Sequence, residues 1–264
     1  ERLLPVCGET LVFDEPGESD AVKRNAKPFV IWVRSTAVRP DDRYDLHVHV
    51  HGGEAARRLT LGSGFPLVLA TLDLGALSGD YRGAFPDRKS WDASISSVDR
   101  AVSEVVGREV KADRILVSSF SAGYGAIGEI LTATGDAPPS GVILLDSLHA
   151  SYKASPPGEV EPITLEPFLG YARRALEGRG FFALTHSAIV PPGYASTSEV
   201  GTYFLRTLAV EASPLDAPSQ GLALRRVAGE KGFILRGYAG EDKGAHCAHL
   251  TLLPELIESW LEKR

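Results

Sequence analysis

Methionine is absent from the 264-residue sequence, which begins with Glu1, so we expect an N-terminus that has been processed or trimmed. A signal peptide ahead of it remains possible. Long apolar runs are also absent, and none approaches the roughly 18 residues of a membrane-spanning helix. The formal net charge of -6 disfavours nucleic acids and anionic membranes as partners, because both attract basic surfaces.

Cysteine is scarce, with only Cys7 and Cys247 in the chain. Their number and spacing give no zinc-binding motif. Two readings stay open: two free thiols, or one disulfide that ties the N-terminal segment to the loop around His246. Disulfides persist in oxidising compartments, so a disulfide would place the protein outside the cytoplasm. A secreted or periplasmic location is therefore slightly preferred.

Apolar runs and amphipathic segments alternate from about residue 65 onward. Strands expected to be continuously apolar are typical of a parallel sheet covered on both faces. The sequence therefore predicts one α/β domain over residues 1–264, with a doubly wound, mostly parallel sheet. Expected strands lie at 29–34, 44–50, 65–74, 114–118, 141–146, 181–185 and 232–236. Expected helices lie at 90–106, 122–132, 165–177, 199–210 and 252–261.

The segment Ser119-Phe120-Ser121-Ala122-Gly123 joins an expected strand to an expected helix. A serine between small residues at such a turn is the pattern of a nucleophile elbow. Ser119 stands where the motif usually has glycine, but it is still small. The helix N-terminus favours negative charge that develops beside Ser121. The structural alternative is a tight turn in which Ser121 only caps the helix.

His51-Gly52-Gly53 ends the expected strand 44–50, one strand and one helix before the Ser121 turn. In this order the two motifs resemble the α/β-hydrolase superfamily, in particular esterases and lipases with an HGG loop, over residues 29–264. The resemblance implies a serine hydrolase with backbone N–H donors for an oxyanion from Gly52, Gly53 and Ala122. The alternative is an ordinary glycine turn at the end of a strand.

The same resemblance places a histidine after the last strand. Ala245-His246-Cys247-Ala248-His249-Leu250 is similar to the G-H-x-x-H-L segment of many members, with alanine in place of glycine. It implies His246 as the general base and His249 as a structural residue. Most members place the acid after the strand expected at 181–185, where no carboxylate follows closely.

Three carboxylates compete for the role of the acid. Asp146 ends the strand 141–146, the position that a minority of members use, and we prefer it. Glu199 is second, since Ser196-Thr197-Ser198-Glu199 already reads as a capping box. Asp242 is a distant third, because its loop also carries the base. Asp146 has a structural alternative too, as the cap of the next turn.

The histidines at 47, 49 and 51 alternate, so they share one face of a strand, with Asp45 beside them. We nevertheless expect no metal site and no cofactor. Lid-like insertions are expected at about 147–164 and 188–198. His51, Tyr81, His149 and Tyr194 are the expected substrate-binding residues, with Asp80 near the entrance.

Hydrolysis of a carboxylic ester through an acyl-enzyme is the preferred activity, because alkoxides leave more readily than amines. The ester is either a small molecule or part of a polymer. A peptidase or amidase on the same fold is the first alternative, and a catalytically inactive binding protein is the second. The sequence does not define the oligomeric state.

Overall fold

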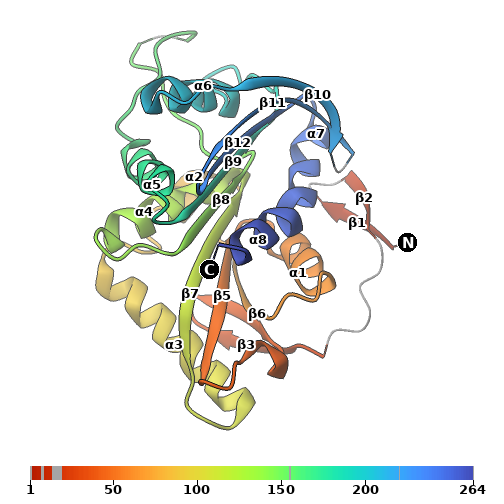
Figure 1. Cartoon of the computed structure of the whole chain (residues 1–264), viewed down its shortest axis with the longest axis vertical. Helices are drawn as coiled ribbons and strands as arrows, with labels where there is room; N and C mark the ends of the chain where they lie inside the picture. Colours follow the sequence, from red (N-terminus) through yellow and green to blue (C-terminus); the bar gives the residue numbers. More distant parts are fainter. Residues whose placement is uncertain (1, 7–8, 14–19, 155, 220, 264) are drawn as a thin grey trace.

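The computed structural model describes residues 2–6, 9–13, 20–154, 156–219 and 221–263. A ten-stranded sheet runs through it, with strand order β10-β11-β12-β9-β8-β7-β5-β6-β4-β3 (Figure 1). The strands are β3 (Val22–Ala26), β4 (Phe29–Val33), β5 (Arg43–Val50), β6 (Leu67–Leu72), β7 (Lys111–Phe120), β8 (Gly141–Leu145), β9 (Phe181–His186), β10 (Ser213–Ser219), β11 (Leu222–Glu230) and β12 (Phe233–Tyr238).

The centre of this sheet is parallel, and its two flanks are antiparallel. The six strands from β12 through β9, β8, β7 and β5 to β6 pair in parallel. The hairpins β10–β11 and β3–β4 extend the two ends. A separate two-stranded sheet joins β1 (Arg2–Val6) to β2 (Glu9–Phe13). The predicted mostly parallel, doubly wound α/β architecture is therefore confirmed.

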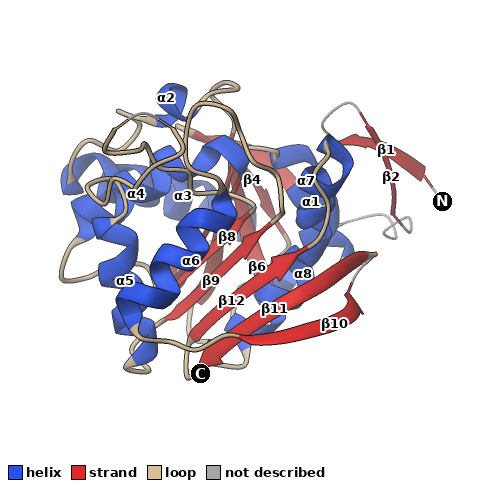
Figure 2. Cartoon of the chain, turned by 90° about the horizontal axis from the view of Figure 1, so that it is seen from above, coloured by secondary structure: helices blue, strands red, loops and turns tan. Residues whose placement is uncertain are grey.

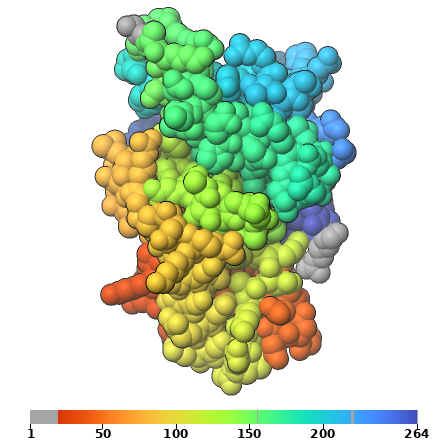
Figure 3. All heavy atoms as spheres, turned by 90° about the vertical axis from the view of Figure 1, so that its left-hand side faces the viewer, coloured from red at the N-terminus to blue at the C-terminus, as the bar shows by residue number. Residues whose placement is uncertain are grey.

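Helices cover both faces of the sheet (Figure 2). One face carries α3 (Arg88–Val106), α4 (Tyr124–Thr134), α5 (Glu166–Leu176) and α6 (Thr197–Leu208). The other carries α1 (Gly53–Gly62), α7 (Lys243–Ala248) and α8 (Leu253–Leu261). Figure 3 looks onto the first face, where α3, α4 and α5 lie side by side. The short helix α2 (Ser78–Tyr81) packs beside α4.

The two layers bury separate apolar clusters. Val48, Ile130 and Phe204 belong to the cluster beneath α3–α6, and Leu116 and Trp260 belong to the one beneath α1, α7 and α8. Every residue of β6, β8 and β9 is buried, which explains their continuous apolar runs. The described part of the chain contains no helix long and apolar enough to cross a bilayer.

Several predicted boundaries were wrong in detail. Helix α3 begins at Arg88, because Asp87 rather than Ser90 is its N-cap and accepts from the Ser90 N–H. The predicted helix 122–132 is a 3-10 turn at Ser121–Gly123 followed by α4. Four further elements, α1, α7, β10 and β11, were not predicted from the sequence.

Cys247, a residue of α7, is buried and disulfide-bonded. Cys7 lies outside the described residues.

Candidate active site

Three neighbouring strands, β5, β7 and β8, end at the same edge of the sheet. The residue that directly follows each strand is not glycine, yet it has a positive φ: 69° at His51, 48° at Ser121 and 40° at Asp146. Such conformations cost about 1–3 kcal/mol each, and they cluster at functional sites because they aim side chains precisely. The structure therefore brings the predicted nucleophile and the preferred acid to one edge, with His51 beside them.

The turn that carries Ser121 is as tight as the sequence predicts. A Cβ atom on Gly123 would lie 2.3 Å from the carbonyl oxygen of Val50 and 3.0 Å from Cβ of Ser119. Only glycine lets the start of α4 approach β5 this closely. Phe120, the last residue of β7, is buried and its ring lies 4.5 Å from that of His246. Phe120, directly before Ser121, therefore packs against the predicted base His246.

The hydroxyl groups of two neighbouring serines hold the backbone of the turn at Ser121 in place. Oγ of Ser147 donates to the carbonyl oxygen of Ser121 over 2.7 Å. The Oγ atoms of Ser119 and Ser147 lie 2.9 Å apart, and since Ser147 has only one hydroxyl proton, Ser119 is the donor of that pair. The serine that replaces the usual glycine at 119 thus contributes to holding the backbone of Ser121.

His246 and Asp146 form the principal hydrogen bond of the site. Nδ1 of His246 lies 2.6 Å from Oδ2 of Asp146. The carboxylate accepts only, so Nδ1 carries the proton and Nε2 of the neutral ring keeps its lone pair. A histidine held in this tautomer can accept a proton at Nε2. Asp242, the third candidate acid, is instead the N-cap of α7 and accepts from the Ala245 N–H.

Asp146 is almost completely buried, and both its oxygens are used. Oδ1 accepts from the Ser187 N–H at 2.8 Å and from the Thr197 hydroxyl at 2.5 Å. Burial raises the pKa of Asp146, but the hydrogen bonds from His246 and Thr197 outweigh it and hold the pKa well below its ordinary range. The group is therefore ionised at neutral pH and presents a negative charge to Nδ1 of His246.

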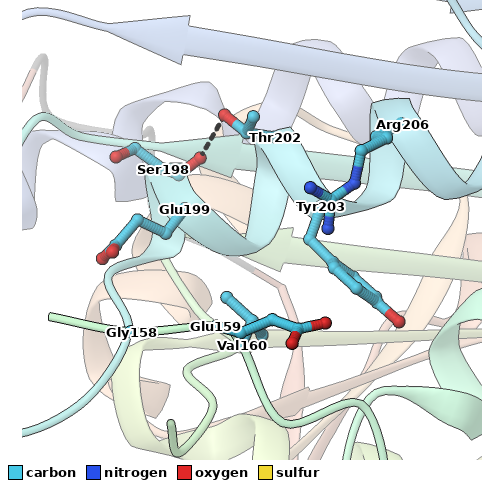
Figure 4. A pocket seen from close by; sticks show the side chains of 8 residues that line it. All are labelled: Gly158, Glu159, Val160, Ser198, Glu199, Thr202, Tyr203 and Arg206. Carbon is cyan, nitrogen blue, oxygen red and sulfur yellow. Dashed lines mark hydrogen bonds between the residues drawn. The ribbon is translucent and has the colours of Figure 1, made fainter. Parts of the chain in front are cut away.

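Glu199 has a structural role elsewhere. It accepts from the N–H and hydroxyl of Ser196 in a capping box on α6, as predicted, and from the hydroxyl of Tyr152. Its side chain lines a pocket of about 250 Å³ together with Glu159 and Arg206 (Figure 4). Asp146, not Glu199, is therefore the carboxylate that contacts the predicted base.

The predicted oxyanion donors Gly52 and Gly53 have another partner. Their N–H groups donate to the carboxylate of Asp73, over 2.8 Å from Gly52 and 3.2 Å from Gly53. A Cβ on Gly53 would lie 2.4 Å from Oδ2 of Asp73, so the glycine admits the carboxylate. This departs from the predicted role, because Asp73 follows β6 and its reach across to the loop after β5 is invisible in the sequence. Ala122, the third predicted donor, is buried directly after Ser121.

Tyr81, predicted to contact substrate, is fully buried and holds two loops together. Its hydroxyl donates to the carbonyl oxygen of Gly75, accepts from the Leu74 N–H, and lies 2.8 Å from Nδ1 of His51. The ring of His51 stacks on Phe120. Tyr81 thus supports His51 from inside the protein, because α2 turns its side chain inward.

The two predicted insertions meet beside the site. Ala150 of 147–164 forms a β-bridge with Ala195 of 188–198. Nδ1 of His149 donates to the carbonyl oxygen of Ala195 over 3.2 Å, and the His149 ring packs edge-on against Tyr194. Burial lowers the pKa of His149. Tyr194 itself remains about half exposed, at 46%. Both residues therefore lie in the expected loops.

The histidines of β5 form an internal hydrogen-bonded chain. Nε2 of His49 donates to the carbonyl oxygen of His51, so its Nδ1 accepts from Oγ of Ser118, and Ser118 in turn accepts from Nε2 of His47. Burial lowers the pKa of His49 to about 4. Asp45 pairs with Arg39 and Arg114 instead. Among the described residues, no cluster of three or more His, Cys, Asp or Glu side chains is arranged to hold a metal ion.

His249 is fully buried, and its Nδ1 lies 2.8 Å from Oγ1 of Thr185. Burial lowers its pKa to about 4. Its ring packs edge-on against Tyr238. His249 is therefore packed inside the protein, whereas His246 is the histidine that contacts Asp146.

No protein-family model matches this sequence, and no curated protein matches it either. Solved structures do match over nearly the whole chain. Enterobactin esterase FES from Shigella flexneri gives a TM-score of 0.54 at 14% identity, covering 96% of this chain and 65% of that one. The poly(3-hydroxybutyrate) depolymerase LpqC from Bordetella parapertussis gives 0.50 at 14% identity, covering 95% and 92%. The chain has the α/β-hydrolase fold. It spans about two-thirds of the length of the enterobactin esterase.

Within this α/β-hydrolase fold, four polar residues around the site were not predicted from the sequence: Asp73, Ser147, Ser187 and Thr197. Each acts through a contact between segments that are distant in sequence, such as that between Asp146 and Thr197, which are 51 positions apart. The sequence signal for them was their position: Asp73, Ser147 and Ser187 come just after β6, β8 and β9, and Thr197 begins α6. Ligands of such sheets bind beyond the carboxyl ends of the strands.

Proposed function

We propose that the protein is a serine hydrolase that cleaves carboxylic esters, with Ser121 as nucleophile, His246 as general base and Asp146 as the acid. The observation that carries this proposal is the 2.6 Å contact between His246 and Asp146 beside an elbow in which Ser121 has a φ of 48°. A buried carboxylate, an oriented imidazole and a strained serine at one sheet edge suit nucleophilic catalysis.

The proposed reaction begins when Nε2 of His246 takes the hydroxyl proton of Ser121 while Oγ attacks the ester carbonyl carbon. The resulting imidazolium is stabilised by the ionised Asp146. Collapse of the tetrahedral intermediate breaks the ester C–O bond, and His246 returns the proton to the departing alkoxide. Water then attacks the acyl-enzyme, with His246 again as base, and releases the carboxylic acid and Ser121.

Stabilisation of the oxyanion is assigned to the Ala122 N–H at the start of the helical turn. Gly52 and Gly53 are not assigned as oxyanion donors, because their N–H groups donate to the carboxylate of Asp73. A carboxylate at that position repels a second anion, so the oxyanion is expected on the Ala122 side of Ser121.

Esters are preferred over amides because an alkoxide leaves more readily than an amine. The similarity in fold to an enterobactin esterase and to a poly(3-hydroxybutyrate) depolymerase supports this preference. A peptidase or amidase would use the same three residues. Turnover of peptide anilides without turnover of aryl esters would select that alternative.

Labelling with a fluorophosphonate probe, mapped by mass spectrometry, tests the proposal. We expect the adduct on Ser121, its loss in Ser121→Ala and slower labelling in His246→Ala. Ser96→Ala, on the exposed side of α3, is the matched control and should label normally. A folded protein that takes up no probe would overturn the mechanism and favour an inactive binding protein.

We further propose a secreted or periplasmic location, in which the disulfide bond of Cys247 persists. The disulfide-bonded state of Cys247 supports this proposal, since such bonds persist in oxidising compartments.

A further inference from the structure

Asp146 is a buried carboxylate with no permanently charged partner. In the described part of the chain no lysine or arginine pairs with it, and its ion-pair contact is with His246. Three donors surround it: Nδ1 of His246 at Oδ2, and the Ser187 N–H and the Thr197 hydroxyl at Oδ1. A buried charge is costly unless its hydrogen bonds are made, so each of these donors contributes to keeping Asp146 ionised.

The other imidazoles near Asp146 supply no compensating charge at neutral pH. His149, His186 and His249 all interact electrostatically with its carboxylate. Burial lowers the pKa of each ring, to about 4 for His186 and His249, so these rings are neutral at pH 7. The negative charge of Asp146 is therefore balanced by its hydrogen-bond donors, and by His246 whenever that ring is protonated.

The Thr197 hydroxyl is not needed to cap α6. Ser196 is the N-cap, and it exchanges hydrogen bonds with Glu199 in the capping box. Thr197 is the first residue of the helix, and its Oγ1 lies 2.5 Å from Oδ1 of Asp146, with no other hydrogen-bond partner among the described residues. An ionised carboxylate only accepts, so Thr197 is the donor. The single hydrogen bond of this hydroxyl thus goes to the proposed acid.

We propose that Thr197 is a positioning residue of the hydrolase, whose hydroxyl orients the Asp146 carboxylate and thereby sets the pH at which His246 can act as a base. This inference rests on the proposed roles of Asp146 and His246. Without the hydroxyl, Oδ1 keeps only the Ser187 N–H, and the carboxylate carries more negative charge toward Nδ1 of His246. A protonated ring is then more stable, so His246 keeps its proton to a higher pH.

The titration of the His246 ring, followed by NMR, tests this without any substrate. A His246→Gln variant identifies the resonance among the seven histidines. Thr197→Val removes the hydroxyl but keeps the branched shape, and we expect it to raise the midpoint by about 0.5–1 pH unit. Thr197→Ser should titrate like the parent. Thr134→Val is the matched control, because it removes an equally buried hydroxyl that donates to the carbonyl oxygen of Ile130 in α4, and it should leave the midpoint unchanged.

The rate of p-nitrophenyl acetate hydrolysis should follow the same shift. Below the midpoint, a shift of 0.5–1 unit corresponds to a loss of about three- to tenfold in kcat/KM, because less of the ring is unprotonated. We expect the loss in kcat, with a smaller change in KM. His51, His149 and His249 also interact with the ring of His246, but they are the same in every variant compared with the parent.

Circular dichroism and the thermal midpoint verify that each variant is folded, and Thr197→Ala provides the same test if valine prevents folding. An unchanged His246 titration in a folded variant that lacks the hydroxyl would overturn the inference. So would an equal shift in Thr134→Val, or a Thr197→Ser variant that titrates like Thr197→Val. A ring whose titration depends on Thr197, in a protein that hydrolyses no ester, would instead overturn the proposed function and leave the hydrogen-bonded array intact.

Discussion

The hydroxyl of Ser147 donates a 2.7 Å hydrogen bond to the backbone carbonyl oxygen of Ser121. The two residues follow adjacent strands, β8 and β7. The bond therefore fixes the position of the turn at Ser121 relative to Asp146, the neighbour of Ser147 in the chain. The hydroxyl group of a serine after β8 thus holds the backbone of the serine after β7.

Ser147→Ala should destabilise the protein and misplace the nucleophile. The substitution removes a partner from a backbone carbonyl and from Ser119 in a buried region, at a cost of about 1–3 kcal/mol. We expect lower free energy of unfolding in urea and a reduced kcat with a smaller change in KM. Ser96→Ala removes a similar bond from Oγ to a helix carbonyl at an exposed position and serves as the control. Equal effects in the two variants would refute a positioning role for Ser147.

Asp146→Asn should reduce kcat/KM for an activated ester by about 10³–10⁴-fold. An amide nitrogen facing Nδ1 reverses the ring tautomer, so Nε2 then carries the proton and cannot accept one from Ser121. Glu199→Gln is the matched control, because its carboxylate serves the cap of α6. A loss in Glu199→Gln as large as that in Asp146→Asn would reassign the acid.

Acid should destabilise the fold through buried imidazoles. Burial lowers the pKa of His49, His186 and His249 to about 4 from 6.5. Between these values the unfolded chain binds protons that the folded chain does not, so the free energy of unfolding decreases as the pH falls from 7 to 4. Each group contributes up to about 3 kcal/mol at the lower limit.

Urea unfolding at a series of pH values measures this dependence. His186→Gln removes one such group but keeps an acceptor for Arg226, so its dependence should be shallower. A free energy of unfolding that is constant between pH 7 and 4.5 would show that the imidazoles titrate normally in the folded state.

Gly123→Ala should prevent or severely weaken folding, because the added Cβ would lie 2.3 Å from the Val50 carbonyl oxygen. Gly170→Ala is the matched control in helix α5, where no atom lies within 4 Å of the new Cβ. Alanine is preferred over glycine inside helices by about 1 kcal/mol, so this variant should unfold at a higher temperature. Thermal unfolding of both variants tests this prediction. A Gly123→Ala variant that unfolds at the parent's temperature would mean that the turn at Ser121 can move away from the Val50 carbonyl oxygen.

Intact-mass measurement with iodoacetamide tests the proposed disulfide. We expect no adduct on the unfolded, non-reduced protein and two adducts after reduction, since the chain has only two cysteines. Adducts on the non-reduced protein would show free thiols and remove the support for an extracytoplasmic location.

The central sheet was predictable because its strands are buried on both faces and read as unbroken apolar runs. The β10–β11 hairpin was not, since Pro214 and Pro218 argue against a strand. Proline is tolerated there because β10 is the edge strand, where a missing N–H removes no inner ladder bond. Helix α1 was missed because it starts within the two glycines that suggested a loop.

Three residues of the site could be predicted from the sequence because they follow parallel strands whose carboxyl ends meet at one edge of the sheet. Ser121, Asp146 and His51 each follow a strand directly. The role of Asp73 was not predictable, because nothing local to Gly52 shows that a carboxylate from a neighbouring strand occupies its N–H group. The inward turn of Tyr81 likewise depends on tertiary packing.

The carboxylate of Asp146 grips the second insertion at both of its ends, through the Ser187 N–H and the Thr197 hydroxyl. The residues between these two anchors, with Val190 and Tyr194 at their exposed tip, form a closed loop on a fixed base. We expect the length and sequence of this loop to tolerate change while the two anchoring hydrogen bonds to Asp146 are kept. The loop is therefore a position at which substitutions could alter specificity without moving His246, whose Nδ1 contacts the other oxygen of Asp146.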